Sequence, residues 1–206
     1  MTLDVPDVDA DPLVQLTRWL DEARAAGQEL PEAMALATAT PDGAPSNRFV
    51  LLRGLDHGLV FFTDYESDKA AELEANPRAA AVLNWQMPAH RQVRVIGSVA
   101  RVTDEESDRY WSTRPPGSRR SAAASHQSRV IPSRAALEAQ VADLASRYPN
   151  DGDVPRPTRW GGYRITPERV ELWEQQPDRL HDRLRYRRSA SAGDSTTTWV
   201  RERLAP

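Results

Sequence analysis

Short apolar segments with turn residues between them recur along this chain, and they constrain its fold more than any other feature. Residues 91–102, RQVRVIGSVARV, alternate between apolar and polar positions, which is the period of a strand with one buried face. Turn residues fill the gaps between such segments, as in the PDG of residues 41–43. The sequence predicts strands over residues 33–40, 46–52, 59–63, 78–85, 91–102, 160–165, 170–175, 184–188 and 196–204.

Helix signals are fewer and lie between these strands. Asp11 and Pro12 are the residue types preferred at a helix N-cap and first helical position, so we expect an N-terminal helix over about 12–26. Leucines recur at helical spacing within that range. Ser67 is the expected cap of a second, short helix.

A longer helical insertion is expected over about 103–147. Thr103 and Glu106 have the spacing of a capping box, which marks the start of a helix. Ser133 is the expected cap of a further amphipathic helix. Between them, residues 114–128 contain two prolines and a glycine, and we expect a loop with one helical turn there.

Many strands with few helices favour an antiparallel barrel with peripheral helices, a mainly β fold. The alternation of strands and helices that builds a parallel sheet is absent, as are the glycine-rich nucleotide-binding motifs. A phosphorylated cofactor would therefore have to be held by side chains. No interior stretch has the composition of a linker, so residues 1–206 are expected to form a single domain.

Composition excludes several classes of protein. Hydrophobic residues make up 39% of the chain and charged residues 28%, as in a soluble globular protein. No apolar run reaches membrane-spanning length, no secretory signal is visible, and the absence of cysteine makes a cytoplasmic location the default expectation. A net charge of −3 argues against a nucleic-acid partner bound through bulk charge.

Metal and hydrolase chemistry have little support in the sequence. His181 and Asp182 are adjacent, but the chain has only four histidines and no cysteine, and none of the usual zinc-binding spacings occurs. No serine lies in a nucleophile elbow, and no catalytic pair of carboxylates stands out. We therefore expect no metal site.

One cluster of cations and hydroxyls lies near the second and third predicted strands. Arg48, Arg53, Thr63, Ser67 and Lys69 fall on a likely hairpin and the turn after it, and Lys69 is the only lysine of the chain. Side chains on paired strands lie about 5 Å apart at Cβ, so these donors can converge on one phosphate. The alternative is a set of surface arginines paired with nearby carboxylates, Asp56, Asp64 and Glu66.

A second cluster follows the strand predicted over 170–175. Residues 177–188, PDRLHDRLRYRR, contain many arginines and one histidine. Arg179 and His181 could flank a planar anionic ligand, because a guanidinium stacks on π systems and an imidazole donates hydrogen bonds. The alternative is a salt-bridged turn with Asp178 and Asp182. Trp173, like the other tryptophans, is by itself more typical of the core.

Taken in order, the motifs of this chain resemble the pyridoxine (pyridoxamine) 5′-phosphate oxidase family. The similarity extends from about Asp11 to Pro206, in the family's order and spacing, and the C-terminal motifs are highly specific. The stretches that carry it are RFVLLRG, FFTDYESDKAAELEANPRAA, RQVRVIG, YWSTRPPGS, SHQSRVIPSR, WGGYRI, VELWEQQPDRLHDRLRYRR and ERLAP.

The resemblance implies a split β-barrel, antiparallel and Greek-key-like, that forms a homodimer with FMN at the subunit interface. It implies oxidation of pyridoxamine or pyridoxine 5′-phosphate to pyridoxal 5′-phosphate, with O₂ reduced to hydrogen peroxide. In this reaction a hydride passes from the substrate's C4′ carbon to flavin N5. The flavin carries the chemistry and the protein positions the reactants, so no titrating nucleophile is required.

The family motifs also assign residues. Together with Ser67 of the first cluster, the FMN-binding set is Arg48, Phe49, Val50, Leu51, Leu52, Arg53, Phe62, Thr63, Lys69, Gln92, Gln127, Ser128, Trp173 and Arg183. The substrate-binding set is Arg53, Tyr110, Arg114, Ser118, Arg179 and His181, of which Arg179 and His181 lie over the pyridine ring as the catalytic pair. Two phosphates thus have two groups of donors.

The chain departs from the family's pattern beside the substrate pocket. Arg53 stands where lysine is usual, and Asp68 stands where an arginine usually precedes the phosphate-binding lysine. Residues 119–125 differ from the family's usual stretch, and the N-terminus lacks the segment that closes over the substrate in some members. These changes put the substrate's identity in doubt, and Asp68 puts the affinity for FMN in doubt.

Two other functions therefore remain open. The stretch ASHQS resembles the phenazine-biosynthesis flavin oxidases, so a paralogue that oxidises another reduced ring is the nearest alternative. The other is a flavin-binding module without catalysis.

Overall fold

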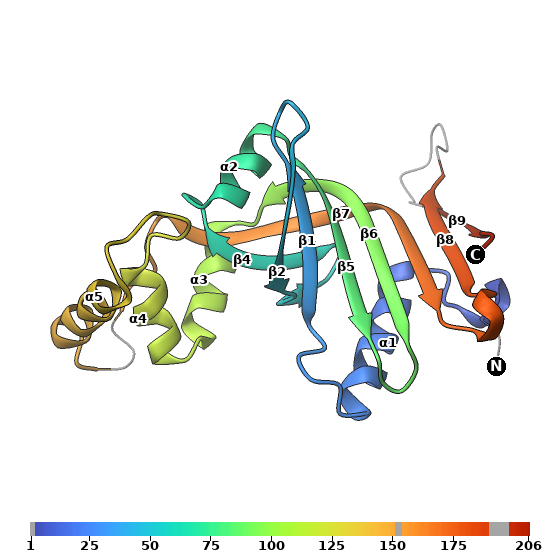
Figure 1. The fold of residues 1–206 in the computed structure, drawn as a ribbon, viewed down its shortest axis with the longest axis horizontal. Coiled ribbons are helices and arrows are strands. Elements are labelled where there is room, and N and C mark those ends of the chain that lie inside the picture. Colours follow the sequence, from blue (N-terminus) through green and yellow to red (C-terminus); the bar gives the residue numbers. More distant parts are fainter. Residues whose placement is uncertain (1–2, 151–153, 190–197) are drawn as a thin grey trace.

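The apolar segments pair into one antiparallel sheet of nine strands in the computed structural model, which describes residues 3–150, 154–189 and 198–206 (Figure 1). Every strand pair in it is antiparallel. The strands are β1 (Ala33–Ala39), β2 (Pro45–Leu51), β3 (Gly54–Leu55), β4 (Leu59–Asp64), β5 (Arg78–Trp85), β6 (Arg91–Arg101), β7 (Trp160–Glu174), β8 (Asp182–Arg188) and β9 (Trp199–Arg203). The start of the strand predicted over 196–204 lies outside the described residues.

The strand order makes the sheet curl into a barrel. The order is β2-β1-β5-β6-β7-β4-β3, and β3 follows β2 directly in the chain. The chain therefore connects the two ends of the sheet, and the Arg53 N–H, between β2 and β3, donates to the Val60 carbonyl of β4 at 2.8 Å. This confirms the predicted barrel, and the pairing of β1 with β5 gives it the expected non-sequential, Greek-key-like order.

The barrel is split along β7, a single strand where the sequence predicted two. Its first half pairs with β4, and its second half pairs with β8. The register against β6 shifts between Ile96 and Gly97, opposite Pro167. A proline lacks the N–H that a regular strand pair uses, and it is tolerated at such an irregularity. Glycine is needed opposite it, because a Cβ on Gly97 would lie 2.0 Å from the Thr166 carbonyl oxygen.

The main core lies inside the barrel and against α1 (Pro12–Ala25). Alternate residues of β1, β5 and β6 point inward, among them Leu36, Leu83 and Val95, all fully buried. The helix begins with the predicted Asp11 cap, whose carboxylate accepts from the Leu13 N–H. It adds Leu16 to the same core.

The remaining helices form a second, smaller layer at the end of the molecule opposite β8 and β9 (Figure 1). They are α3 (Asp104–Thr113), α4 (Pro116–Ala124) and α5 (Arg134–Arg147), while α2 (Asp68–Ala75) covers the barrel beside β1. The predicted capping box of α3 forms as expected. The expectation of a loop with one helical turn at 114–128 was wrong, because Pro116 occupies the first turn of α4, where its missing N–H costs nothing.

The short helix α2 begins after Ser67, as predicted, but the Ser67 hydroxyl does not cap it. It donates instead to the Asp64 carbonyl at 2.7 Å. Among the described residues, no helix is both long enough and apolar enough to cross a membrane.

Candidate functional site

A cleft of about 780 Å³ lies where β2 and β4 of the barrel face α3 and α4. Residues of β2 and β4 supply one wall, and residues of α3 and α4 supply the other. The residues that line it are Arg48, Phe49, Val50, Leu51, Arg53, Phe62, Thr63, Asp64, Lys69, Tyr110, Arg114, Gly117, Ser118, Ser121, Ala122, Ser125, Gln127 and Trp160.

Lys69 is a buried ammonium group in this cleft without a carboxylate partner. Its Nζ lies 2.6 Å from Gln127 Oε1, 3.2 Å from Ser67 Oγ and 3.3 Å from Thr63 Oγ1, all uncharged oxygens. It forms no ion pair with any residue that the structure describes. Burial, and then the positive charge of Arg48, lower the pKa of Lys69. An anion bound here would relieve both effects.

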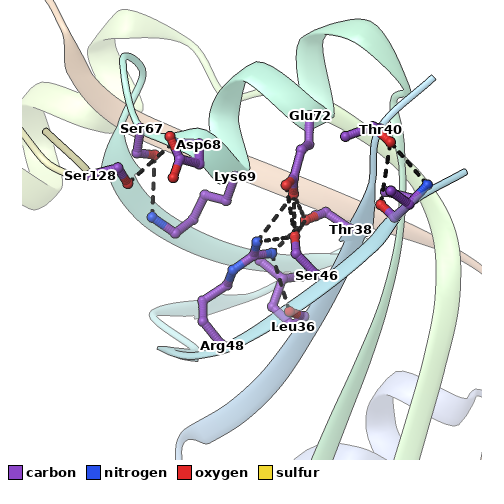
Figure 2. Close-up of polar contacts among 12 residues, drawn as sticks. Leu36, Thr38, Thr40, Ser46, Arg48, Ser67, Asp68, Lys69, Glu72 and Ser128 are labelled. Atoms are coloured by element: carbon purple, nitrogen blue, oxygen red, sulfur yellow. Dashed lines mark hydrogen bonds and ion pairs between the residues drawn. The ribbon is translucent and has the colours of Figure 1, made fainter. Parts of the chain in front are cut away.

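Arg48 lies beside Lys69 but is already engaged, as Figure 2 shows. Its Nη2 donates to Glu72 Oε2 at 3.1 Å and to Ser46 Oγ, while its Nη1 contacts Thr38 Oγ1 and the Leu36 carbonyl. These contacts occupy the four Nη hydrogens of the guanidinium, so Nε is the donor left for a ligand. Arg48 forms no ion pair with Asp56, Asp64 or Glu66, which were its expected alternative partners.

Glu72 closes this network from α2. Its carboxylate accepts from Ser46 at 2.6 and 2.8 Å, from Thr38 and from Arg48 (Figure 2). Although burial alone raises the pKa of Glu72, these hydrogen bonds hold it below its usual value. Glu72 thus ties the helix to β1 and β2 and fixes the position of Arg48.

Asp68, the departure from the family's pattern, is exposed at the start of α2. Its backbone N–H donates to Ser128 Oγ at 3.3 Å, so Ser128 lies next to the Lys69 cluster (Figure 2). Ser128 has a φ of 69°, in the left-handed region that is uncommon for a serine. The 125–128 loop is therefore held against the first turn of α2.

Aromatic rings and a second cation line the cleft where β4 and β7 meet the end of α3. Phe62 stacks on both Tyr110 and Trp160, with centroids 4.1 and 5.4 Å apart, and the Arg114 guanidinium lies 4.6 Å from the Trp160 ring centroid. Burial, and then the charges of Arg53 and Arg119, lower the pKa of Arg114.

The Nη1 of Arg114 is buried and has no hydrogen-bond partner in the structure. Such orphaned donors are rare in folded proteins and call for an explanation. Tyr110 and Ser118 line the same part of the cleft, from α3 and α4. Together they make a second place for an anion.

The cleft is cationic because its one lining carboxylate is neutralised. Asp64 pairs with Arg159 at 2.6 Å, and that arginine also donates to the carbonyls of Ala122 and Ala123 on α4. Arg53, in contrast, makes no ion pair with a described residue. Arg48, Arg53, Lys69 and Arg114 thus bring more positive charge to the cleft than its acids balance.

The remaining predicted residues lie elsewhere in the same chain. Gln92 and Trp173 are a cross-strand pair of β6 and β7, and Trp173 is also paired with Arg183 of β8. Arg179 and His181 lie in the turn after β7, at the end of the molecule opposite α3 and α4 (Figure 1). One chain therefore does not bring these five residues to its own cleft.

Nineteen of the twenty predicted residues line the cleft, belong to the distant group or are buried supports, and the twentieth, Ser128, lies beside the cleft through its bond to the Asp68 N–H. Twelve of them line the cleft: Arg48, Phe49, Val50, Leu51, Arg53, Phe62, Thr63, Lys69, Tyr110, Arg114, Ser118 and Gln127. Leu52 is in the main core, and Ser67 is buried beneath Lys69. Arg179 and His181 make no salt bridge with Asp178 or Asp182, which was the alternative for that turn.

Sequence reasoning missed three residues that shape the cleft. Glu72 holds Arg48, Arg159 neutralises Asp64, and Trp160 stacks in the aromatic wall. Glu72 and Arg48 are 24 residues apart in the chain, so no local spacing pairs them. Nothing in the sequence pairs Arg159 with Asp64, because they are distant in the chain. No cluster of potential metal ligands occurs among the described residues.

Comparison with known proteins matches almost the whole chain. Residues 20–148 match the family model described as pyridoxamine 5′-phosphate oxidase. Residues 160–206 match the model described as pyridoxine 5′-phosphate oxidase C-terminal dimerisation region. A pyridoxine/pyridoxamine 5′-phosphate oxidase of Salinibacter ruber is 51% identical over 197 residues, 95% of this chain and 89% of that protein. The one of Ralstonia pickettii is 51% identical over 207 residues, 100% of this chain and 93% of that protein.

Solved structures show the same fold. The crystal structure of PhzG from Burkholderia lata 383, in complex with tetrahydrophenazine-1-carboxylic acid, has a TM-score of 0.90 at 34% identity and covers 100% of this chain and 98% of its own. A pyridoxamine 5′-phosphate oxidase-related, FMN binding protein from Nostoc punctiforme has a TM-score of 0.72 at 19% identity, over 93% of this chain and 95% of its own. This second likeness is one of fold alone.

Proposed function

Because this chain belongs to the pyridoxamine 5′-phosphate oxidase family, we propose that it is an FMN-dependent oxidase. Its proposed reaction converts pyridoxamine or pyridoxine 5′-phosphate to pyridoxal 5′-phosphate and reduces O₂ to hydrogen peroxide. The observation that supports this most directly is the presence of two separate cations, Lys69 and Arg114, without carboxylate partners in one cleft. Two phosphorylated molecules, a cofactor and a substrate, give each cation a partner.

The residues around Lys69 suit the phosphate of FMN. The ammonium group offers a charge-assisted hydrogen bond, and Thr63, Gln127 and Ser128 offer polar groups within the same few ångströms. The outward-facing part of β2, including Phe49, which is 77% exposed, would face the isoalloxazine ring. In this proposal Arg48 contributes charge and one donor, since Glu72 and Ser46 hold its Nη2, and Thr38 and the Leu36 carbonyl hold its Nη1.

Tyr110, Arg114 and Ser118 suit the phosphate of the substrate. Tyr110 and Arg114 are four residues apart at the end of α3, so they share one side of it, and Ser118 follows at the start of α4. A substrate without a phosphate would leave the Arg114 Nη1 unpartnered. Arg53 adds a further positive charge at the same cleft.

We infer that the site is completed by a second copy of the chain. Gln92, Trp173, Arg179, His181 and Arg183 are far from the cleft of their own chain, and all but Gln92 belong to the region that matches a dimerisation model. β2 has a free edge and carries the exposed Phe49, which favours a partner on that side. In a homodimer, each copy would supply these residues to the cleft of the other.

We also infer that the chain forms one domain. The nine-stranded sheet joins strands from both matched regions, and β7 of the second region pairs with β4 and β6 of the first. Neither region closes the barrel without the other.

In the proposed mechanism the protein orients and the cofactor reacts. When bound, FMN supplies a hydride acceptor at N5 for the substrate's C4′ carbon, and it passes the electrons on to O₂. Arg114 and Tyr110 would anchor the substrate by its phosphate, at a distance from the reacting carbon. Arg179 and His181 would hold the pyridine ring, and Arg183 would place positive charge near the flavin.

The nearest alternative is the oxidation of another reduced ring. PhzG, which was crystallised with a tetrahydrophenazine carboxylic acid, shares 34% identity with this chain. The pyridoxine/pyridoxamine 5′-phosphate oxidases share 51%, and the unpaired Arg114 favours a phosphorylated substrate. A flavin-binding module without catalysis is the second alternative.

The test is to purify the protein with FMN, remove O₂, and add pyridoxine 5′-phosphate or pyridoxamine 5′-phosphate. We expect the yellow colour to bleach with either, and hydrogen peroxide to form when O₂ is readmitted. Bleaching only by a dihydrophenazine would favour the alternative substrate. A yellow protein that no candidate reduces would favour the binding module, and a colourless protein that takes up no FMN would overturn the proposal.

A further inference from the structure

The turn that carries Arg179 and His181 is held in an unusual conformation. It joins β7 to β8, and two successive residues in it, Asp178 and Arg179, have φ angles of 55° and 61°. Left-handed backbone at residues other than glycine persists only where surrounding contacts hold it. The contacts around this turn therefore show what fixes the two proposed substrate-binding side chains.

His181 is oriented from within the turn. Its Nδ1 accepts a hydrogen bond from the Gln176 backbone N–H at 3.2 Å, so the neutral ring carries its proton on Nε2. The ring packs against Trp173 with centroids 4.8 Å apart. His181 thus has a defined tautomer and presents Nε2–H as a donor. Its orientation depends on the position of Gln176.

Gln176 is in turn held by the buried carboxylate of Asp182. The Gln176 side-chain nitrogen donates to Asp182 Oδ2 at 2.8 Å. The same oxygen accepts from the Leu3 backbone N–H at 3.0 Å, and Oδ1 accepts from Arg203 at 2.7 Å. Asp182 is 4% exposed, so its donors come from the protein and not from solvent. Three distant parts of the chain meet at this one side chain.

The Leu3 end of this link belongs to an N-terminal strap, residues 3–9. Leu3 and Val8 are buried in the main core. Arg201 of β9 donates to the carbonyls of Val5 and Val8, each at 3.1 Å, and the Tyr186 hydroxyl of β8 donates to the Asp9 carbonyl at 2.7 Å. The strap is therefore bound along the β8–β9 hairpin and ends at Asp182.

We propose that Asp182 is a positioning residue that couples the N-terminal strap to the turn carrying Arg179 and His181. Its carboxylate holds Gln176, Gln176 holds the imidazole, and the strap holds the carboxylate. The proposal rests on the proposed function only in that Arg179 and His181 meet the substrate. The coupling itself is a property of the chain without any ligand.

The main test variant is Asp182→Asn, which keeps the size of the side chain. Its amide nitrogen would face either the Leu3 and Gln176 donors or the Arg203 guanidinium, so one set of donors loses its acceptor. We expect the rate of flavin reduction at saturating pyridoxine 5′-phosphate to fall about 10-fold to 100-fold, as for a misplaced reacting group. The affinity for FMN should change by less than about threefold, because Lys69 and its neighbours are untouched.

Gln176→Ala is the second variant, since Asp182→Asn could weaken folding. It removes the link between Asp182 and the turn but leaves the strap bound to Asp182 and Arg203. We expect a fall in the same rate with little change in melting temperature. The matched control is Asp21→Asn: Asp21 pairs with Arg24 on α1, at 2.8 Å, and touches neither the strap nor the turn. It should leave the rate unchanged.

Tryptic cleavage after Arg179 measures how firmly the turn is held, and it needs neither FMN nor substrate. Mass spectrometry detects the fragment that starts at Leu180. We expect faster cleavage in Asp182→Asn and Gln176→Ala than in Asp21→Asn and the parent protein. Equal cleavage in all four proteins would overturn the inference, and so would a rate loss in Asp21→Asn as large as in Asp182→Asn. If the parent protein itself oxidises no substrate while cleavage changes as expected, the proposed function fails and the coupling stands.

Discussion

Two regions of this molecule are rich in positive charge, and they differ in how that charge is balanced. On the β7–β8–β9 sheet, Arg183 pairs with Glu171 at 2.8 Å, and Arg185 and Arg187 share Glu202 at 2.6 and 2.9 Å. In the cleft, Lys69 hydrogen-bonds only to neutral oxygens, and Arg114 has a buried nitrogen without a partner. Cations that the protein itself neutralises need no further counterion, whereas buried cations left unbalanced are suited to an anionic ligand.

Lys69→Met gives the sharpest test of this difference. Methionine fills a similar volume without charge, so we expect FMN to bind about 100-fold more weakly, from the loss of one charge-assisted bond of ~3 kcal/mol. Riboflavin, which lacks the phosphate, should bind as before. The FMN-free protein should melt at a higher temperature, because a buried charge has been removed. Flavin fluorescence titrations and thermal melts measure these effects, with Arg134→Met on α5 as the control.

Arg114→Met should weaken the binding of the substrate and leave the affinity for FMN unchanged. We expect the KM for pyridoxine 5′-phosphate to rise about 10-fold or more, because a hydrogen bond to a charged group contributes ~1.5–3 kcal/mol. Steady-state kinetics at increasing substrate check this. Arg185→Met removes a guanidinium that Glu202 already neutralises, and it should leave KM unchanged. Equal effects of the two substitutions would remove the distinction between the regions.

Glu72→Gln tests the network that holds Arg48 through its pH dependence. The folded-state pKa of Glu72 is below its ordinary value, so its charge stabilises the fold above about pH 4.5, and this contribution is lost as the pH falls through the lowered pKa. The free energy of unfolding of the two proteins should therefore differ most at neutral pH and converge in acid. Denaturant melts between about pH 3 and pH 7 measure this. Glu138→Gln, in an exposed pair with Arg134, should show little pH-dependent difference.

Arg187→Met should have the smallest effect. Its pair with Glu202 is partly exposed, so we expect a change of about 0.5 kcal/mol or less in the free energy of unfolding and none in the affinity for FMN. A loss of FMN binding here would mean that Arg187 itself contacts the ligand although Glu202 neutralises it.

The sequence predicted the elements where local signals were strong. The Asp11 cap, the capping box of Thr103 and Glu106, and the alternation of residues 91–102 all appear where they were expected. The predicted element boundaries were wrong at two prolines, because the structural role of a proline depends on its surroundings. Pro167 lies between the two strands predicted over 160–165 and 170–175 and proves to be at a bulge within β7, and Pro116 was expected in a loop but opens α4.

In the candidate site, too, the sequence identified residues but not their tertiary contacts. Residue types and family motifs were enough to single out Lys69, Arg114 and Tyr110, which the structure brings to one cleft. The partners that give these residues their electrostatic character were not predictable, because Glu72 and Arg159 reach their partners through strand pairing and helix packing. No local pattern reports such contacts.

The sequence by itself determined the strand and helix pattern, the family, and the identity of the residues proposed to bind phosphate. Each of these depends on residue types and short spacings, which the chain carries whatever its conformation. Only the tertiary structure decided which cations remain unbalanced and that Arg179 and His181 lie far from the cleft of their own chain. It also decided that Asp182 joins the N-terminal strap to their turn. Charge balance and burial depend on contacts between residues far apart in the sequence, and folding alone creates those contacts.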